Sequence, residues 1–211
     1  RQLIETMQTH LHLSNAAAHE RAVAWLEQVG IPAAAQRISA YPHELSGGQR
    51  QRVVIALALC AEPALLIADE PTTALDVSIQ AQIIALLKRL AREHETAVML
   101  VTHDMGVIAE AADRVAVMYA GRIAEVGPVD AVIRAPGHPY TEGLMASIPS
   151  LDHRADRLRQ IDGAMPRLDA MPPGCRFHPR CPRAFARCGA EQPPLLSTGM
   201  TRAACWLHTH D

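Results

Sequence analysis

The stretch that decides the fold is Leu65–Asp76, which reads Leu-Leu-Ile-Ala-Asp-Glu-Pro-Thr-Thr-Ala-Leu-Asp. Four apolar residues stand directly before the adjacent carboxylates Asp69 and Glu70. A short apolar run that stops at charged residues is typical of a buried strand, and residues 64–68 are predicted to form one. The alternative is a strand that ends in two solvated acids without a catalytic role. If the strand is catalytic, Asp69 can hold Mg²⁺ through water, and Glu70 can orient and deprotonate a water molecule.

Outward from this stretch, strands and helices alternate. Apolar spacing predicts helices over residues 49–61 and 77–93 and a second buried strand over 96–101, followed by Thr102-His103-Asp104. This order predicts an α/β domain with a mainly parallel sheet. Ligands of such sheets bind at the carboxyl ends of the strands, which is where Glu70 and His103 fall. Further along, Ala120-Gly121 predicts a two-residue hairpin turn between strands 114–119 and 122–126.

A glycine pair opens the first of these helices. The sequence Leu45-Ser46-Gly47-Gly48-Gln49 leaves backbone N–H groups uncovered at a helix start, where the helix dipole adds partial positive charge. This favours a phosphate site, and the alternative is an ordinary serine-capped loop.

Taken together, three motifs carry a resemblance. Leu-Ser-Gly-Gly-Gln at 45–49, the stretch 65–76 and Val-Thr-His-Asp at 101–104 resemble the signature motif, the Walker B strand with D-loop, and the switch histidine of ABC transporter ATPase subunits. The resemblance implies that Glu70 is the catalytic base, Asp69 the magnesium-side acid, and that His103 contacts the γ-phosphate. It further implies that residues 46–49 touch ATP held by an opposite subunit and that Asp76 lies at the dimer interface. The residues concerned are Ser46, Gly47, Gly48, Gln49, Asp69, Glu70, Asp76 and His103.

The resemblance implies three further features that the sequence lacks: the Walker A P-loop, the aromatic residue that stacks on adenine and the Q-loop glutamine. A phosphate-binding P-loop requires Gly-Lys-Ser/Thr, and the single lysine, Lys88, follows Leu86-Leu87. The chain also begins with Arg1 rather than Met. We therefore expect an ABC-type P-loop ATPase fold that lacks its N-terminal portion, with a gap in the sheet between strands 96–101 and 114–119. We expect such a chain to be inactive alone.

Four of the five cysteines lie in a proline-rich tail, as Cys175-x5-Cys181-x6-Cys188-x16-Cys205. Metal binding is favoured over disulfides, but the spacing is a poor match for zinc, whose sites usually show closer cysteine pairs. Four thiolates suit an iron–sulfur cluster, and four free thiols remain the alternative. His138-Pro139-Tyr140-Thr141 and this tail resemble the C-terminal extension of oligopeptide and dipeptide importer ATPases, some of which carry a 4Fe–4S cluster on these cysteines. The fifth, Cys60, is predicted to lie in the core.

The resemblance implies residues 1–149 as the C-terminal part of an ABC ATPase domain and 150–211 as a small, irregular, Cys-rich extension. It implies ATP and Mg²⁺ as ligands and a place on the cytoplasmic face of a bacterial membrane. Its implied partners are a second ATPase subunit, two permease subunits and, indirectly, a substrate-binding protein. Peptides, nickel and glutathione all fit this tail type. A non-catalytic interaction subunit, or a fragment keeping only the signature-motif side of a partner's ATP site, is the alternative.

Composition sets limits on other function classes. The formal net charge is −2, which does not favour a protein that grips nucleic acid, and so argues against an ABC-type ATPase of DNA repair or translation. The longest apolar run, residues 53–61, has nine residues, whereas a membrane span needs about 20. No secretory leader opens the chain.

Overall fold

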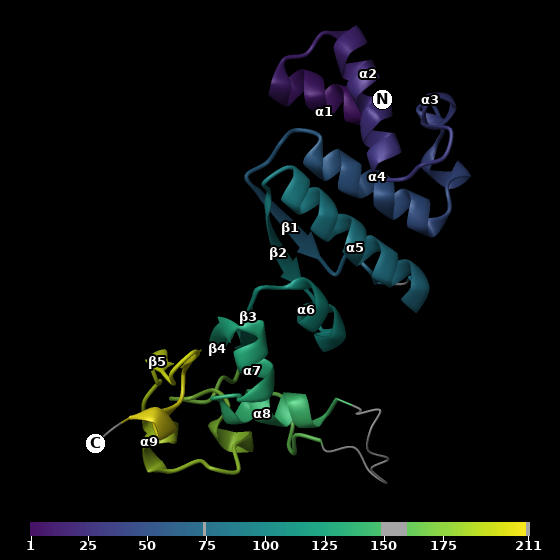
Figure 1. Ribbon diagram of the computed structural model, residues 1–211. Coiled ribbons are helices and arrows are strands. Elements are labelled where there is room, and N and C mark those ends of the chain that lie inside the picture. The colour runs from purple at the N-terminus through teal and green to yellow at the C-terminus, as the bar shows by residue number, and fades with distance from the viewer. Residues whose placement is uncertain (74, 149–159, 210–211) are drawn as a thin grey trace. The chain divides into compact units, whose positions relative to one another are not determined.

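The computed structural model describes residues 1–73, 75–148 and 160–209, and the chain divides into two compact units, Arg1–Val107 and Ile108–Asp211 (Figure 1). The elements of the first unit are α1 (Gln2–Leu11), α2 (Asn15–Gln28), α3 (Ala34–Arg37), α4 (Gly47–Leu59), β1 (Leu65–Asp69), α5 (Val77–Glu93) and β2 (Ala97–Val101). Helix α6 (Met105–Ala111) crosses the boundary between the units. The elements of the second unit are β3 (Arg114–Tyr119), β4 (Arg122–Pro128), α7 (Val129–Arg134), α8 (Pro139–Ala146), α9 (Ala186–Ala190), β5 (Leu196–Ser197) and β6 (Arg202–Ala203). Single 3₁₀ turns form at Pro42–Glu44, His178–Arg180 and Trp206–His208.

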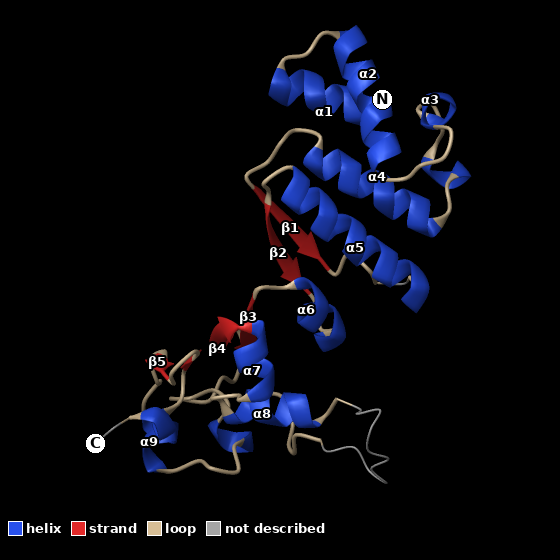
Figure 2. Ribbon diagram, in the orientation of Figure 1, coloured by secondary structure: helices blue, strands red, loops and turns tan. Residues whose placement is uncertain are grey.

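Helices build the core of the first unit (Figure 2). Side chains from α1, α2, α4 and α5 meet in one cluster in which Met7, Ile83 and Leu90 are fully buried. Helix α5 begins where Asp76 accepts a hydrogen bond from the Ile79 N–H at 2.9 Å, which satisfies an otherwise free donor of the first turn. The helix predicted over 77–93 is confirmed at both ends.

Strands β1 and β2 are parallel, with Leu65 opposite Ala97 and Asp69 opposite Val101. One face of this pair is covered, because Leu66, Ala68 and Val98 pack against the helical core. The other face is open within the described residues, and its apolar side chains are exposed: Leu65 by 53%, Ile67 by 58%, Met99 by 48% and Val101 by 46%. The prediction of two fully buried strands is therefore wrong for this chain.

The second unit contains a four-stranded antiparallel sheet in the order β3-β4-β6-β5. The predicted hairpin is confirmed: Ala120 and Gly121 have φ of 47° and 76°, the left-handed pair that a tight turn between right-twisted strands requires. The expected α/β class holds, but the expectation of a mainly parallel sheet fails, because only β1 and β2 pair in parallel among the described strands. Strands β2 and β3 belong to different sheets.

One buried carboxylate ties distant segments of the second unit together. Glu125 on β4 is fully buried and accepts hydrogen bonds from the Gly137 N–H at 2.8 Å, the His138 N–H at 3.0 Å and the Thr201 hydroxyl at 3.0 Å. A buried carboxylate is tolerated only with such donors. The tail is thus fixed to β4 by polar contacts as well as by the β4–β6 pairing.

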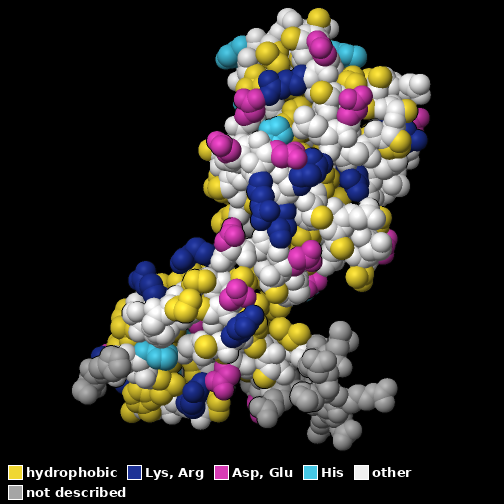
Figure 3. All heavy atoms as spheres, in the orientation of Figure 1, with side chains coloured by type: hydrophobic (Ala, Val, Ile, Leu, Met, Phe, Trp, Pro, Cys, Tyr) yellow, Lys and Arg dark blue, Asp and Glu magenta, His cyan; other side chains and the backbone are white. Residues whose placement is uncertain are grey.

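Charged side chains of both signs are interspersed over the face seen in Figure 3. None of the helices in the described ranges combines the length and the apolar character that crossing a membrane demands. The predicted domain boundary at 149/150 lies outside the described residues and stays a prediction.

Candidate functional site

The first candidate site lies at the carboxyl end of the β1–β2 pair. Glu70 directly follows β1 and continues the ladder, because its N–H donates to the Val101 carbonyl at 2.8 Å. Its φ of 44° lies in the left-handed region, which costs a residue with a side chain about 1–2 kcal/mol. Strain of this kind collects at functional positions and survives only where neighbouring contacts hold it.

Two side chains hold the carboxylate of Glu70. Oε1 lies 2.9 Å from His103 Nδ1, and Oε2 accepts a hydrogen bond from the Thr73 hydroxyl at 2.8 Å. These contacts, that of Thr73 first, hold the pKa of Glu70 below its ordinary value, since each favours the ionised form. The structure thus brings together Glu70 and His103 as an acid–imidazole pair. Both are predicted site residues, and they lie 33 positions apart in the sequence.

The segment after His103 is also fixed. Asp104 Oδ2 accepts from Gln80 Nε2 of helix α5 at 2.8 Å, while Oδ1 accepts from the Gly106 N–H at 2.9 Å and the Val107 N–H at 3.2 Å. The hydrogen bond from Gln80, followed by those backbone donors, keeps the pKa of Asp104 low. An ionised carboxylate therefore pins the loop that carries His103.

The glycine pair lies at the start of α4, where the sequence places it. Ser46 Oγ accepts from the Gln49 N–H at 3.3 Å, and Gln49 Oε1 accepts from the Ser46 N–H at 3.0 Å, so the two residues form a reciprocal capping box. A Cβ on Gly48 would lie 3.1 Å from the Ile79 side chain. The signature-like segment is therefore adjacent to the start of α5, and Asp76, which caps α5, belongs to the same neighbourhood. Asp69 ends β1 opposite Val101 and is exposed.

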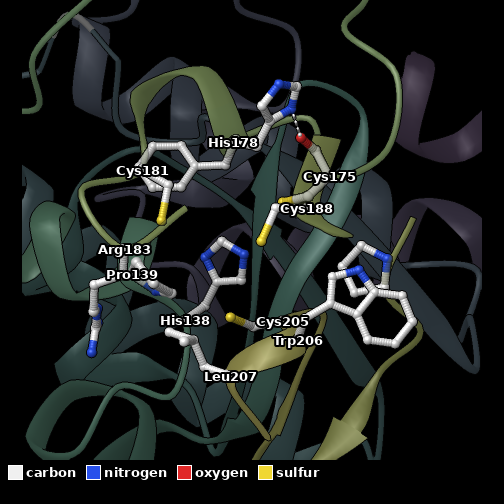
Figure 4. A pocket seen from close by; sticks show the side chains of 12 residues that line it. His138, Pro139, Cys175, His178, Cys181, Arg183, Cys188, Cys205, Trp206 and Leu207 are labelled. Carbon is white, nitrogen blue, oxygen red and sulfur yellow. Dashed lines mark hydrogen bonds between the residues drawn. The ribbon is translucent and has the colours of Figure 1, made fainter. Parts of the chain in front are cut away.

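The second candidate site is a pocket in the second unit (Figure 4). All four tail cysteines line it: Cys175, Cys181, Cys188 and Cys205. In this view the thiols of Cys181, Cys188 and Cys205 turn toward a common space next to the His138 imidazole. In the ranges described, no three His, Cys, Asp or Glu side chains are arranged to hold a metal ion.

Burial raises the pKa of three of these thiols, those of Cys175, Cys181 and Cys205. Each also receives a backbone hydrogen bond from two residues further on, namely from Phe177, Arg183 and Leu207, and this lowers the pKa. The cysteines act on one another as like charges, which raises their pKa again. Four cysteines thus line one pocket, and three of their sulfur atoms accept backbone N–H donors, which a thiolate needs.

His138 forms part of the pocket wall and is neutral. Its Nδ1 accepts from the Tyr140 N–H at 3.0 Å, and it has a second hydrogen bond with the Ala204 backbone. Burial lowers the pKa of His138 to about 4, against the opposing attraction of Glu125. With both hydrogen bonds made inside the protein, His138 supports the wall and is not a free ligand.

Sequence reasoning missed three polar residues that hold these sites, Thr73, Gln80 and Glu125. Thr73 stands three residues after Glu70, a spacing that suits a turn in which a hydroxyl reaches back to a carboxylate. Nothing in the local sequence marks Gln80 or Glu125, because their partners lie 24 and up to 76 positions away.

Two family models match the chain. The model for ABC transporters matches residues 2–73, and the model for the oligopeptide/dipeptide transporter C-terminal region matches residues 124–188. The oligopeptide transport ATP-binding protein AppD of Bacillus subtilis (strain 168) is 50% identical over 211 residues. This chain belongs to the ABC transporter ATP-binding proteins. It carries the C-terminal region typical of oligopeptide and dipeptide transporters.

A second relative from Bacillus subtilis agrees with this assignment. The dipeptide transport ATP-binding protein DppD of the same organism is 48% identical, covering 98% of this chain and 62% of that protein. The match to AppD covers all of this chain and 64% of AppD, so the chain spans somewhat less than two thirds of the curated relatives it matches. A solved dimeric post-hydrolysis structure of the ATP-binding cassette MJ0796, bound to ADP and Pi, is 33% identical with a TM-score of 0.48, covering 56% of this chain and 49% of that one.

Proposed function

We propose that these residues belong to an ATP-hydrolysing subunit that powers import of peptides through an ABC transporter. The observation that carries the proposal is the Glu70–His103 contact of 2.9 Å at the carboxyl end of β1. A carboxylate kept ionised beside an imidazole suits a general base that deprotonates an attacking water, with the imidazole free to contact the phosphate. The names of AppD and DppD support peptides as the transported class.

Asp69 and Glu70 divide the work at this edge. We assign Asp69 to the magnesium side, because a carboxylate at a strand end offers the oxygen ligands and charge that Mg²⁺ prefers. Magnesium neutralises charge on the phosphates when bound. Glu70 takes the water's proton through a carboxylate oxygen, and His103, 83% exposed at its side chain, is accessible to a phosphate group.

The glycine pair and Asp76 act toward a partner in this proposal. Gly47 and Gly48 offer helix-start N–H groups, and Ser46 and Gln49 offer the donors of their side chains, to the γ-phosphate of ATP held by a second ATPase subunit. Asp76 caps the start of α5, which is next to the glycine pair, and it lies at the interface with that subunit. Two permease subunits anchor the dimer at the cytoplasmic face of the membrane, and a substrate-binding protein acts indirectly.

The test is Glu70→Gln in the complete gene product that contains these residues, assembled with its transporter. The neutral amide keeps the shape but cannot take a proton, so we expect ATP turnover to fall by about a hundredfold or more while ATP binding persists. His103→Ala is expected to lower turnover similarly. Normal turnover by Glu70→Gln contradicts a catalytic Glu70.

One observation favours a second candidate, a non-catalytic subunit. The only lysine, Lys88, does not stand in a Gly-Lys-Ser/Thr sequence, so these 211 residues hold no P-loop lysine. We expect the 211-residue chain by itself to show no ATPase activity. Turnover by this chain that Glu70→Gln abolishes would contradict that expectation. Full activity of the complete gene product carrying Glu70→Gln would favour the non-catalytic candidate.

For the pocket of the second unit we propose a 4Fe–4S cluster on Cys175, Cys181, Cys188 and Cys205. The support is that four thiols line one pocket and that three of them accept backbone N–H bonds, which stabilise metal-bound sulfur. A cluster bonds each thiolate to a different iron and so needs its sulfurs further apart than one zinc ion does. No three side chains of the described residues are arranged to hold a metal ion, so it is the wide spacing of the cysteines along the sequence that ranks zinc second.

Elemental analysis of protein purified without oxygen tests the cluster. We expect iron and sulfide near four per chain, and loss of both in Cys188→Ala. Cys60→Ala is the matched control, because Cys60 is a buried thiol of the other unit. Stoichiometric zinc without iron would mean that the four cysteines bind zinc and no cluster. Four titratable thiols without any metal would contradict both the cluster and the zinc site.

A further inference from the structure

The turn that follows β1 contains a side chain to which neither the motifs nor the comparisons give a role. Thr73 makes two contacts with Glu70: its hydroxyl donates to Glu70 Oε2 at 2.8 Å, and its N–H donates to the Glu70 carbonyl at 3.1 Å. One residue thus holds both the side chain and the backbone of the proposed base. The backbone contact closes the turn in which Glu70 takes its φ of 44°.

The two carboxylate oxygens have different partners. His103 Nδ1 lies at Oε1, so the Thr73 hydroxyl is what fixes the other oxygen. With both oxygens held, rotation of the carboxylate is restricted, and each oxygen keeps one acceptor direction for water.

We propose that Thr73 is a positioning residue that aims the Glu70 carboxylate at the attacking water. The proposal rests on the function proposed above for Glu70. A carboxylate held at both oxygens keeps the orientation that proton abstraction from a bound water requires. Thr73 acts through Glu70 and touches no reacting atom.

The experiment compares Thr73→Val with Thr73→Ser in the complete gene product. Valine keeps the branched shape without the donor, and serine keeps the donor. We expect Thr73→Val to lower kcat about tenfold and to leave KM for ATP within about twofold. Thr73→Ser is expected to stay within about twofold of the parent on both measures.

A second readout separates this proposal from the function on which it rests. The Glu70 carboxyl signal in ¹³C-Glu-labelled protein, assigned by its loss in Glu70→Gln, reports the hydrogen bonding of the carboxylate without turnover. We expect Thr73→Val to move this signal, because Oε2 loses its donor, and Thr73→Ser to leave it in place. Thr96→Val is the matched control, because its hydroxyl donates to the Pro63 carbonyl at 3.0 Å, and its loss should leave the Glu70 signal unchanged.

Each outcome has one meaning. An unmoved Glu70 signal and parental kcat in Thr73→Val overturn the positioning role, as does equal damage from Thr73→Ser. A moved signal in Thr73→Val together with parental turnover in Glu70→Gln upholds the contact, removes Glu70 as base, and so overturns the proposed role of Thr73 in catalysis.

Discussion

Gly174 lies where its loop approaches helix α9 closely in the cysteine segment. Its φ is +64°, and a Cβ there would lie 2.5 Å from the Cys188 carbonyl oxygen, to which the Cys175 N–H donates at 2.8 Å. Any side chain at position 174 therefore meets backbone atoms that cannot move without breaking the hydrogen bond from the Cys175 N–H to the Cys188 carbonyl. We expect Gly174→Ala to lower the free energy of unfolding of the second unit by about 3 kcal/mol or more.

Urea unfolding followed by circular dichroism checks this value. Gly199→Ala is the matched control, since Gly199 also has a left-handed φ of +91° but nothing within 4 Å of a Cβ. It should lose only the backbone strain, about 1–2 kcal/mol. Equal losses in the two variants would mean that the contact with Cys188 does not matter.

His138 gives the second unit a pH-dependent stability. Its pKa is about 4 in the folded chain and near 6.5 when unfolded, so between these values the unfolded chain binds the extra proton. The free energy of unfolding of metal-free protein should therefore fall as pH drops from about 6.5 to about 4, by about 3 kcal/mol in total. We expect this slope to disappear in His138→Asn, measured by urea unfolding at several pH values. An unchanged slope would assign it to other groups.

At the scale of single elements, the open face of β1 and β2 is the main feature. Leu65, Ile67 and Met99 present an exposed apolar row beside outer strand edges that pair with no other described strand, and such a surface is a template for association. We expect the 211-residue chain to self-associate, and the double variant Ile67→Thr with Met99→Gln to reduce this at a cost below about 1 kcal/mol. Light scattering and size-exclusion chromatography measure it.

Leu66→Thr is the control for that experiment, because Leu66 faces the helical core from the same strand. It should destabilise the first unit by about 2–3 kcal/mol without improving solubility. A monomeric parent chain with a sharp cooperative melt would contradict the prediction of self-association.

The same strands show what sequence could and could not provide. Helix α5 was predictable at both ends, because Asp76 is a capping residue and apolar residues recur at helical spacing up to Leu90. The exposure of Ile67 was not, since an apolar run reads the same whether or not residues of this chain cover it. The sequence also predicted that Glu70 and His103 lie at one edge of the sheet. It did not predict the hydrogen bond from Thr73, because that contact depends on the geometry of the turn.

In the tail, sequence reasoning placed four cysteines and little else. Strands β5 and β6 are two residues each, too short for any alternation to show. Their position depends on pairing of Ala203 with Glu125, 78 positions away by number, which no local pattern encodes. The pocket thus follows from long-range contacts that only the folded chain displays.

At the scale of the whole molecule, each unit has its own core. Ile83 is fully buried in the first unit and Val132 in the second. We expect two calorimetric unfolding transitions. Ile83→Ala should lower the midpoint of only one transition and Val132→Ala that of only the other. Each variant should lower the free energy of unfolding of its own unit by about 2–4 kcal/mol. One transition shifted equally by both variants would mean that the units unfold as one.

The contacts of Glu125 bear on how genes of this family can recombine. A Cβ on Gly127 would lie 2.8 Å from the Thr201 side chain, and Glu125 holds Thr201 directly, so β4 and the tail are fitted to each other residue by residue. A tail transplanted from a relative would meet a strand selected for a different tail. Successful chimeras should therefore have their crossover points before Arg122, so that β4, the Gly137 loop and the cysteine segment are inherited as one block.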